Sequence, residues 1–219
     1  SEVTKISGSK RLRLTVNGKT IRADKVVIAT YQPLTNPRPT VLRKAMYVSY
    51  VLEARIPKGM FKEATYLDSS SPYHYFRIDA GKVHDTIIVG GEDHRQDIKV
   101  SPAKNYRALK DYVKELLKGK KFEIIRRWDG PILEPVSGLA LIGKTAKANQ
   151  YVATAFSGNG MTYAMIAAEL LRGLLAGKSN PDIKLYDPAR HITLKQLYYK
   201  GKDYGEEFFG GAVKNVLRY

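Results

Sequence analysis

The chain contains no cysteine among its 219 residues. Within its own sequence it therefore cannot form a disulfide, a thiolate metal site, an iron–sulfur cluster or a cysteine nucleophile. It also lacks an apolar run of membrane-spanning length, and its first residues, SEVTKISGSKRLRL, carry no apolar signal-peptide segment. These absences predict a soluble protein in a cytoplasmic setting.

Patterns typical of catalytic and metal sites are scarce as well. We find no Ser–His–Asp constellation, no paired carboxylates suited to acid–base catalysis and no internal repeat. Glu92, Asp93, His94 and Asp97 have metal-binding side chains, but their spacing matches no familiar site. We therefore predict no metal site and interpret this segment as a loop that caps strand ends.

The charge is strongly one-sided, with a formal net charge of +16 at pH 7. Such an excess can attract nucleic acid or an acidic protein. The basic residues are spread through expected strands and a helix, and no recognisable nucleic-acid-binding motif accompanies them. We interpret them as solvated basic faces. The alternative is a non-catalytic basic module that binds an acidic partner or nucleic acid.

Two segments near the N-terminus predict the start of a sheet. Residues 10–16 and 19–23 alternate polar with apolar side chains around Asn17-Gly18, a dipeptide typical of a two-residue hairpin turn. Residues 25–30, KVVIAT, have an unbroken apolar centre, which is typical of a strand covered on both faces. We therefore expect an exposed hairpin followed by a buried strand.

The middle of the chain predicts an antiparallel sheet with one covering helix. Every second residue is apolar toward the end of 41–56, and 73–79 alternates in the same way. Further strands are expected at 86–89, ending at the glycine pair that follows, and at 122–128. Residues 101–117 begin with Ser-Pro and repeat apolar residues at helical spacing. We expect this helix to cover the apolar face of the sheet.

The expected strand at 73–79 has two faces of different character. On one face His74 lies among apolar residues, where it is expected to be a hydrogen-bonded core residue and not a catalytic base. The other face carries Tyr73, Tyr75 and Arg77, and Tyr47 and Ser49 lie on the neighbouring strand. Together these residues could line a binding cavity or form a solvated surface. Farther along, Trp128 is expected to pack in the core beneath a turn.

A Gly-rich turn connects a short strand at 151–153 to a helix at 161–176. The turn, SGNG at 157–160, ends where free N–H groups and the positive end of the helix dipole gather. Such a position stabilises a phosphate, a carboxylate or an oxygen that gains negative charge. A dinucleotide fingerprint would need a third glycine where Tyr163 stands, so a plain connection without a ligand is the alternative. The helix carries an apolar stripe expected to pack in the core: Met165, Ala168, Leu171 and Leu175.

The order of several motifs resembles a known family. They are ADKVVIAT at 23–30, PYHYFR at 72–77, VGGEDH at 89–94, WDG at 128–130, GLALIG at 138–143, ATAFSGNGMT at 153–162 and LYDP at 185–188. In this order they resemble the FAD-dependent oxidoreductases of the D-amino-acid oxidase and glycine oxidase (DAO) superfamily, over roughly residues 3–190. GGEDH and LYDP look most similar to a subgroup that often carries a C-terminal Rieske domain.

The resemblance implies an α+β fold, with an antiparallel substrate domain and the C-terminal half of a Rossmann-like FAD-binding domain. It implies FAD-binding parts at 1–38 and 129–190, a substrate-binding part at 39–128 and a tail at 191–219. Family members begin with a strand, a G-x-G-x-x-G turn and a helix that bind the ADP half of FAD, and nothing before residue 30 supplies this unit. We therefore expect a portion of a longer or split flavoprotein, with FAD held by the complete protein and not by this chain alone.

The resemblance also implies the binding residues. The FAD-binding set is Ala29, Thr30, Gly143, Ser157, Gly158, Asn159, Gly160, Met161 and Thr162. The substrate-binding set is Tyr47, Tyr73, Tyr75 and Arg77. The substrate would be a small amine or amino-acid-like molecule oxidised by hydride transfer to flavin, and no catalytic residue is assigned because orientation can suffice. Expected partners are the missing nucleotide-binding segment or chain, or a second copy that covers apolar surface near Thr30.

Two features depart from the family pattern. Amino-acid-oxidising members hold the substrate carboxylate with arginine, whereas the corresponding positions here are Ile132 or its neighbours and Gly158. Arg77 can substitute for them. Without cysteine, neither a cysteinyl-flavin link nor a Rieske cluster can form in this chain. The sequence therefore leaves the substrate and the electron acceptor open.

Overall fold

The protein is represented by a computed structural model. The structure describes residues 1–31, 44–69, 72–96, 98–178 and 180–196. The chain divides into two compact units. We call Met46–Ile132 the central unit, and Ser1–Ala45 together with Leu133–Tyr219 the terminal unit. Most of the expected C-terminal tail, from residue 197 onward, lies outside the described residues.

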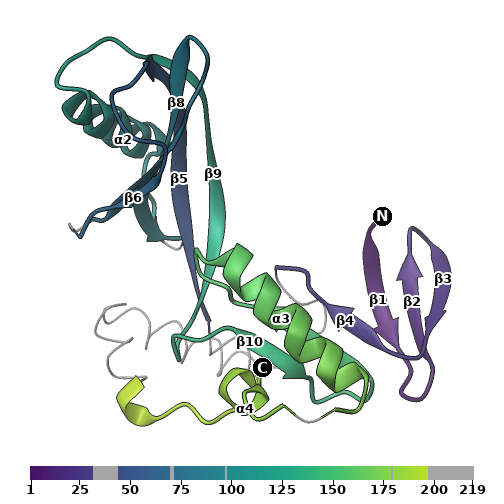
Figure 1. Cartoon of the computed structure of the whole chain (residues 1–219). Coiled ribbons are helices and arrows are strands. Elements are labelled where there is room, and N and C mark those ends of the chain that lie inside the picture. Colours follow the sequence, from purple (N-terminus) through teal and green to yellow (C-terminus); the bar gives the residue numbers. More distant parts are fainter. Residues whose placement is uncertain (32–43, 70–71, 97, 179, 197–219) are drawn as a thin grey trace. The chain divides into compact units, whose positions relative to one another are not determined.

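The central unit is built on a five-stranded sheet with the order β6-β7-β8-β5-β9. Its strands are β5 (Lys44–Pro57), β6 (Thr65–Leu67), β7 (His74–Asp79), β8 (His84–Arg95) and β9 (Glu123–Pro135). The pairs β6–β7, β7–β8 and β5–β8 are antiparallel. Helix α2 (Pro102–Leu116) lies over one face of this sheet (Figure 1). The prediction of an antiparallel sheet with one covering helix is confirmed.

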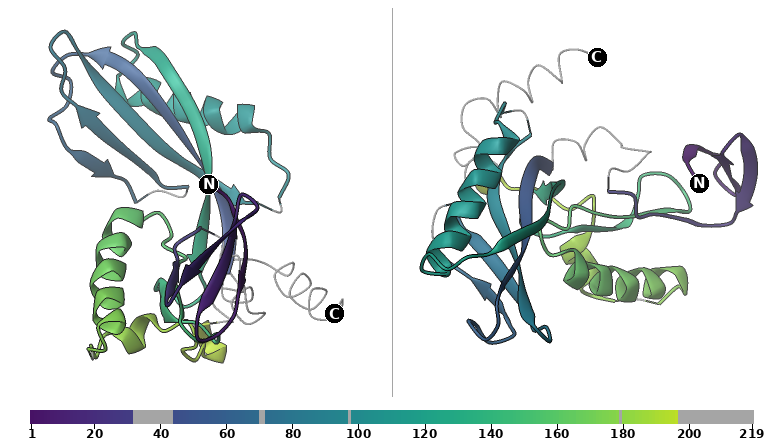
Figure 2. Two further views of the ribbon diagram at one scale, coloured as in Figure 1. Left: turned by 90° about the vertical axis from the view of Figure 1, so that its right-hand side faces the viewer. Right: turned by 90° about the horizontal axis from the view of Figure 1, so that it is seen from above.

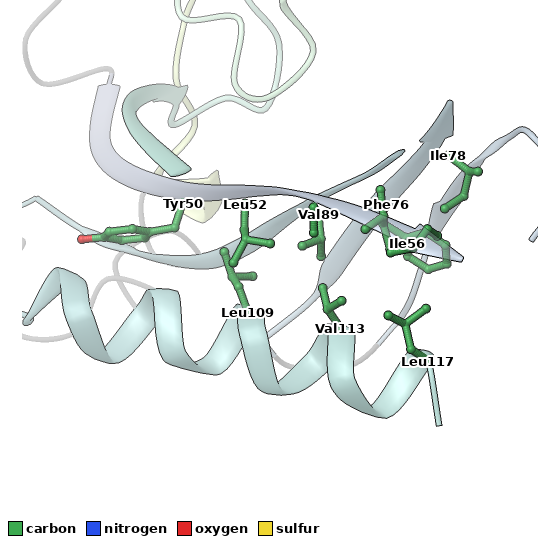
Figure 3. Packing of buried hydrophobic residues seen from close by; sticks show 11 residues of the cluster. Tyr50, Leu52, Ile56, Phe76, Ile78, Val89, Leu109, Val113 and Leu117 are labelled. Carbon is green, nitrogen blue, oxygen red and sulfur yellow. The ribbon is translucent and has the colours of Figure 1, made fainter. Parts of the chain in front are cut away.

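One face of the sheet is apolar and packs on α2, as Figure 3 shows. The buried residues of this core are Tyr50, Leu52, Ala54, Ile56, Phe76, Ile78, Ile87, Val89, Leu109, Val113 and Leu117. The strand residues follow the period of two that the sequence shows. The opposite face of the sheet, which we call the outer face, therefore carries the intervening side chains.

Strand β8 continues past its glycine pair, where the sequence predicted it to end. Val48 pairs with His94 and Tyr50 pairs with Gly91, so the single residue between Val48 and Tyr50 stands opposite two residues of β8. This is a β-bulge. Glu92, the first of the two residues opposite Ser49, has a φ of 55°. The interpretation of residues 92–94 as a capping loop is therefore wrong.

Strand β9 is also longer than predicted and lies at the edge of the sheet. Gly130 and Pro131 are part of the strand and do not form a turn. Trp128 is 39% exposed, and the guanidinium of Arg126 lies 5.3 Å from its ring centroid. The prediction of a core tryptophan is wrong because the next residue, Asp129, reaches Tyr106 on the α2 side, so alternation puts Trp128 on the outer face.

The terminal unit begins with a small antiparallel sheet of order β1-β2-β3. Its strands are β1 (Val3–Ser7), β2 (Leu12–Val16) and β3 (Lys19–Ala23). Asn17 and Gly18 join β2 to β3 with φ values of 46° and 77°. Two successive positive φ angles define the turn that suits a two-residue hairpin, so this prediction is confirmed.

A second sheet of the terminal unit has the order β10-β11-β4. Its strands are β10 (Leu141–Lys144), β11 (Gln150–Thr154) and β4 (Val26–Ile28). Strand β4 runs parallel to β11 and forms the edge of the sheet. Ile28 is buried, whereas Val27 is 40% exposed. The prediction of a strand covered on both faces is therefore wrong for this chain.

Helix α3 (Gly160–Leu175) packs on this sheet (Figure 2), and the short helix α4 (Ile183–Tyr186) follows. The buried face of α3 is formed by Ala167, Leu170 and Leu171. Met165 is 74% exposed, and Ala168 is exposed as well, so half of the predicted core stripe is wrong. The helix is apolar around much of its circumference, so periodicity could not decide which side is buried. No helix in the described part of the chain is both long and apolar enough to cross a bilayer.

We predict that Leu109→Ala lowers the free energy of unfolding of the central unit by about 2–5 kcal/mol, because it opens a cavity beneath α2. Leu109 is 0% exposed. The chain's single tryptophan, Trp128, lies in this unit, so its fluorescence during urea denaturation reports unfolding there. The control is Arg107→Ala on the exposed side of α2, which should change stability by less than about 0.5 kcal/mol. Equal stability of the two variants would contradict the packing described.

Candidate functional site

The predicted binding residues fall on two surfaces, one in each unit. The FAD-binding set belongs to the terminal unit, around the connection from β11 to α3. We call residues 155–160 the Gly turn. The substrate-binding set belongs to the outer face of the central unit.

The Gly turn is held in an unusual backbone conformation. Ala155 and Ser157 have φ values of 60° and 52°, which few residues with side chains adopt. The Ser157 N–H donates to the Leu133 carbonyl at 3.1 Å, and the Asn159 N–H donates to the Phe156 carbonyl at 3.0 Å. These bonds bring the chain sharply from the strand to the start of α3.

The start of α3 exposes backbone donors. Asn159 occupies the N-cap position, but its side chain makes no capping hydrogen bond. Gly158, Asn159 and Gly160 are exposed, and Met161 is 88% exposed. Because the first N–H groups of a helix have no acceptor within the helix, this end can donate to a ligand oxygen.

The end of β4 lies beside the same edge of the sheet. Val152 of β11 pairs with Ile28 in the parallel ladder, so both strands end at this edge. The Thr154 hydroxyl donates to the Tyr31 carbonyl at 2.7 Å and ties the two strand ends together. Ala29 and Thr30 are exposed here. The structure therefore brings these residues and the Gly turn to one edge, the carboxyl edge of parallel strands where α/β sheets bind ligands.

Gly143, the remaining member of the FAD-binding set, lies in β10 and not at this edge. It is buried, and a Cβ at this position would lie 3.0 Å from the Pro188 ring. Its φ of 148° is also one that side chains rarely adopt. Packing against Pro188 therefore suffices to explain a glycine at this position.

The outer face carries a cluster of hydroxyl and carboxylate groups. The Tyr75 ring lies across Gly90, where a Cβ would overlap the phenol. The Tyr73 hydroxyl donates to Asp93 Oδ2 at 2.8 Å. Burial raises the pKa of Tyr75, and the charge of Asp93 raises it further, while the neighbouring Ser49 hydroxyl opposes the shift. Ser49 is buried, with 7% of its surface exposed.

The other predicted substrate residues lie at the borders of this cluster. Tyr47 pairs with Arg95 across β5 and β8, beyond the bulge. Arg77 is exposed, and its guanidinium donates to Asp79 at 2.8 Å. A substrate carboxylate would have to compete with Asp79 for Arg77.

Sequence reasoning placed Ser49 on this face without including it in the substrate-binding set, and it missed Asp93 as a member of this cluster. Simple alternation along β8 puts Asp93 on the same side as Ile87 and Val89, toward α2. The bulge reverses that assignment. The signal that could have revealed it is the glycine pair before Glu92, because glycine inside a strand often accompanies a bulge.

The α2 side of the bulge holds a separate buried polar cluster. His74 Nε2 lies 2.9 Å from Glu92 Oε1, and the His74 ring stacks on Tyr112 at 4.2 Å between centroids. The Asp68 carboxylate accepts from the His74 backbone N–H at 2.8 Å. This confirms His74 as a hydrogen-bonded core residue. His94 also faces α2, where it stacks on Tyr50, so the candidate metal ligands of this segment point to both sides of the sheet. Asp97 lies outside the described residues.

The central unit also has concave surface away from the outer-face cluster. Two adjoining open grooves of about 530 and 440 Å³ share Lys121 and Phe122. Their basic lining residues are Arg55, Lys58, His84, Lys110, Lys114, Lys120 and Lys121. Arg55 pairs with Glu123, which neutralises part of this charge. The grooves contain none of the predicted FAD- or substrate-binding residues, and they suit the alternative of an acidic partner.

Comparison with protein families decides the class of protein. The model for the family "DAO: FAD dependent oxidoreductase" matches residues 1–174. The chain belongs to this family. The sequence-based resemblance is thereby confirmed for the DAO family, whereas the subgroup with a Rieske domain stays a prediction.

Solved structures show the same fold. Glycine oxidase from Geobacillus kaustophilus matches with a TM-score of 0.73 and 21% identity, over 88% of this chain and 52% of that chain. Glycine oxidase from Bacillus cereus ATCC 14579 matches with a TM-score of 0.67 and 17% identity, over 88% of this chain and 53% of that chain. L-proline dehydrogenase from P. horikoshii matches with a TM-score of 0.64 and 19% identity, over 85% of this chain and 52% of that chain. This DAO-family chain thus spans about half the length of these solved chains. Comparison with curated proteins finds no match.

We predict that Gly90→Ala lowers the free energy of unfolding of the central unit by about 1–3 kcal/mol, because the new methyl group overlaps the Tyr75 phenol. Gly130→Ala is the matched control, since a Cβ at Gly130 meets no atom within 4 Å. Its effect should stay within about 1 kcal/mol. Urea denaturation followed by far-ultraviolet circular dichroism compares the two. Equal stability would mean that Tyr75 does not lie across β8.

Proposed function

We propose that this DAO-family chain is the substrate-binding and flavin-closing part of an FAD-dependent oxidoreductase. The complete enzyme oxidises a small amine or amino-acid-like substrate, and the FAD ring supplies the chemistry by accepting a hydride. The observation that carries the proposal is the family match over residues 1–174, which includes the Gly turn and the first turn of α3.

The Gly turn suits the flavin ring in one specific respect. The N–H groups of Gly160, Met161 and Thr162 belong to the first turn of α3, and Asn159 does not cap them with its side chain. These donors and the helix dipole would hold a ring oxygen that gains negative charge. Ala29 and Thr30, at the end of β4, would border the ring from the neighbouring strand.

The proposal assigns the ADP-binding unit to polypeptide outside these 219 residues. Two observations support this assignment. The chain covers about half of the solved DAO-family chains, and among the described strands β4 has a neighbour, β11, on one side. Val27 on β4 and Met161 and Met165 on α3 are exposed apolar side chains that added polypeptide would cover.

The outer face of the central unit is the proposed substrate side. Tyr47, Tyr73 and Tyr75 offer aromatic surface and hydroxyl groups there, which bind small polar molecules by packing and hydrogen bonds. The ion pair between Arg77 and Asp79 reduces the availability of that arginine for a substrate carboxylate. Amines without a carboxylate are therefore included in the proposed substrate class.

We predict that the purified 219-residue chain retains little FAD, whereas the chain together with a G-x-G-x-x-G nucleotide-binding segment binds FAD stoichiometrically. The reason is that the ADP-binding unit supplies most of the contacts to the dinucleotide. Flavin absorbance measures occupancy, and anaerobic bleaching by amines, amino acids and hydroxy acids measures activity. Stoichiometric flavin on the isolated chain would contradict the assignment of the ADP-binding unit to other polypeptide. A loaded protein that no such substrate bleaches would contradict the enzymatic role.

We predict that Asn159→Asp in the loaded protein makes the flavin potential more negative by about 10–40 mV. That shift is the two-electron equivalent of roughly 0.5–2 kcal/mol of repulsion between the new carboxylate and a reduced, negatively charged ring. The control is Asn180→Asp, which adds the same charge beyond the other end of α3 and keeps the oxygen that accepts from the Asp182 N–H. Spectroelectrochemical titration compares the three proteins. Equal potentials in both variants would place the ring away from the Gly turn.

A further inference from the structure

Two buried polar atoms on the outer face have no hydrogen-bond partner among the described residues. They are Ser49 Oγ and Asp93 Oδ1. The Ser49 hydroxyl is close enough to the Tyr75 phenol to influence its pKa, but it makes no hydrogen bond of good geometry. Because an unpartnered buried polar group is costly, and a carboxylate oxygen especially so, this pair requires a physical explanation.

The bulge in β8 places these two atoms on the same side of the sheet. Ser49 stands opposite Glu92 and Asp93, in the interval between the pairs Val48–His94 and Tyr50–Gly91. Glu92 reaches His74 on the α2 side, whereas Asp93 reaches Tyr73 on the outer face. The extra residue thus directs a carboxylate away from the core and toward Ser49. Bulges commonly re-aim a side chain next to a functional site.

The chemistry of the cluster favours a cationic donor. A carboxylate accepts hydrogen bonds and does not donate them, and a serine hydroxyl can accept as well. The Tyr75 phenol adds an acceptor oxygen, and the rings of Tyr73 and Tyr75 add aromatic faces that attract an ammonium group. An ammonium group carries a positive charge and several N–H donors, so it can satisfy Asp93 and Ser49 together.

The charges around the cluster disfavour an anionic ligand at this position. Asp93 repels a carboxylate, and Arg77 is paired with Asp79 on the neighbouring strand. Arg95 stands opposite Tyr47 beyond the bulge, whereas the residues that stand opposite Ser49 are Glu92 and Asp93. A ligand with both an ammonium and an anionic group would therefore direct its ammonium group toward Asp93.

Tyr73 forms the cover of this cluster. Its side chain is 40% exposed, and its hydroxyl donates to Asp93 Oδ2. Rotation of an exposed side chain is fast, so an incoming ammonium group can displace this phenol and reach Asp93. The other oxygen, Oδ1, is in place to accept a second hydrogen bond.

We propose that Asp93 and Ser49 form a binding site for the ammonium group of a small amine on the outer face, with Tyr73 as its cover. The site deepens the proposed function, on which it rests for its role in substrate choice. The binding step itself requires no flavin. In this site, a carboxylate and a hydroxyl of this chain recognise the amine.

The test measures binding of three probes of the same shape to the full chain by titration calorimetry. The probes are benzylammonium chloride, benzyl alcohol and sodium benzoate. We expect benzylammonium to bind at least about tenfold more tightly than the alcohol and the benzoate, because the charged hydrogen bond to Asp93 distinguishes it. No preference for the ammonium probe, including no binding of any probe, would overturn the proposal and leave a buried water as the partner of Asp93.

Variants separate the site from general charge effects. Asp93→Asn, of nearly the same shape, should weaken benzylammonium binding about tenfold or more. The matched control Asp79→Asn removes a different outer-face carboxylate, which pairs with Arg77, and should change binding less than about twofold. Tyr73→Phe removes the competing donor to Oδ2, so binding should be retained or strengthened. Unchanged binding in Asp93→Asn would overturn the proposal.

Circular dichroism spectra and melting temperatures confirm that each variant is folded before binding is compared. If Asp93→Asn fails to fold, the Ser49→Ala and Tyr73→Phe variants decide the outcome, since the first must weaken ammonium binding and the second must not. Failure of the ammonium site leaves flavin binding and bleaching in the loaded protein unaffected. Failure of the proposed function instead leaves ammonium binding by the central unit intact. The two failures are therefore distinguishable.

Discussion

The central unit depends on one constraint, which is the alternation of side chains along β5, β7 and β8. Because α2 covers one face of the sheet, every second residue of these strands must be apolar and buried. The intervening residues are then committed to the outer face. The tyrosines, the serine and the arginine that gather there do so as a consequence of how the opposite face is packed.

One extra residue in β8 modifies this alternation at a single place. Before the bulge, Ile87 and Val89 face α2, and after it His94 does. Glu92 contacts His74 on the α2 side, and Asp93 accepts from Tyr73 on the outer face. The same backbone feature therefore satisfies a polar group in the core and creates a charged group outside it. A shift of this kind changes the chemistry of a surface without changing the strand order.

The terminal unit has a different character, because its second sheet has three short strands in the described part of the chain, and β4 lies at its edge there. Strand β4 contributes three residues to the sheet, and α3 buries one side while exposing two methionines. The unit nevertheless holds a strained turn and a helix start at the carboxyl edge of its parallel pair. The DAO-family match over residues 1–174 includes this turn, in a chain that spans about half of the matched structures.

The sequence by itself determined the elements whose signals are local. Alternation defined β5 and β7, Asn17-Gly18 defined the hairpin, helical spacing defined α2, and ordered motifs defined the family. Tertiary structure decided the bulge, the buried side of α3, the exposure of Trp128 and the open edge of β4. These features depend on which neighbour packs on each face, and no local pattern specifies that neighbour. The position of Asp93 opposite Ser49 belongs to this second group, because it follows from the register between β5 and β8.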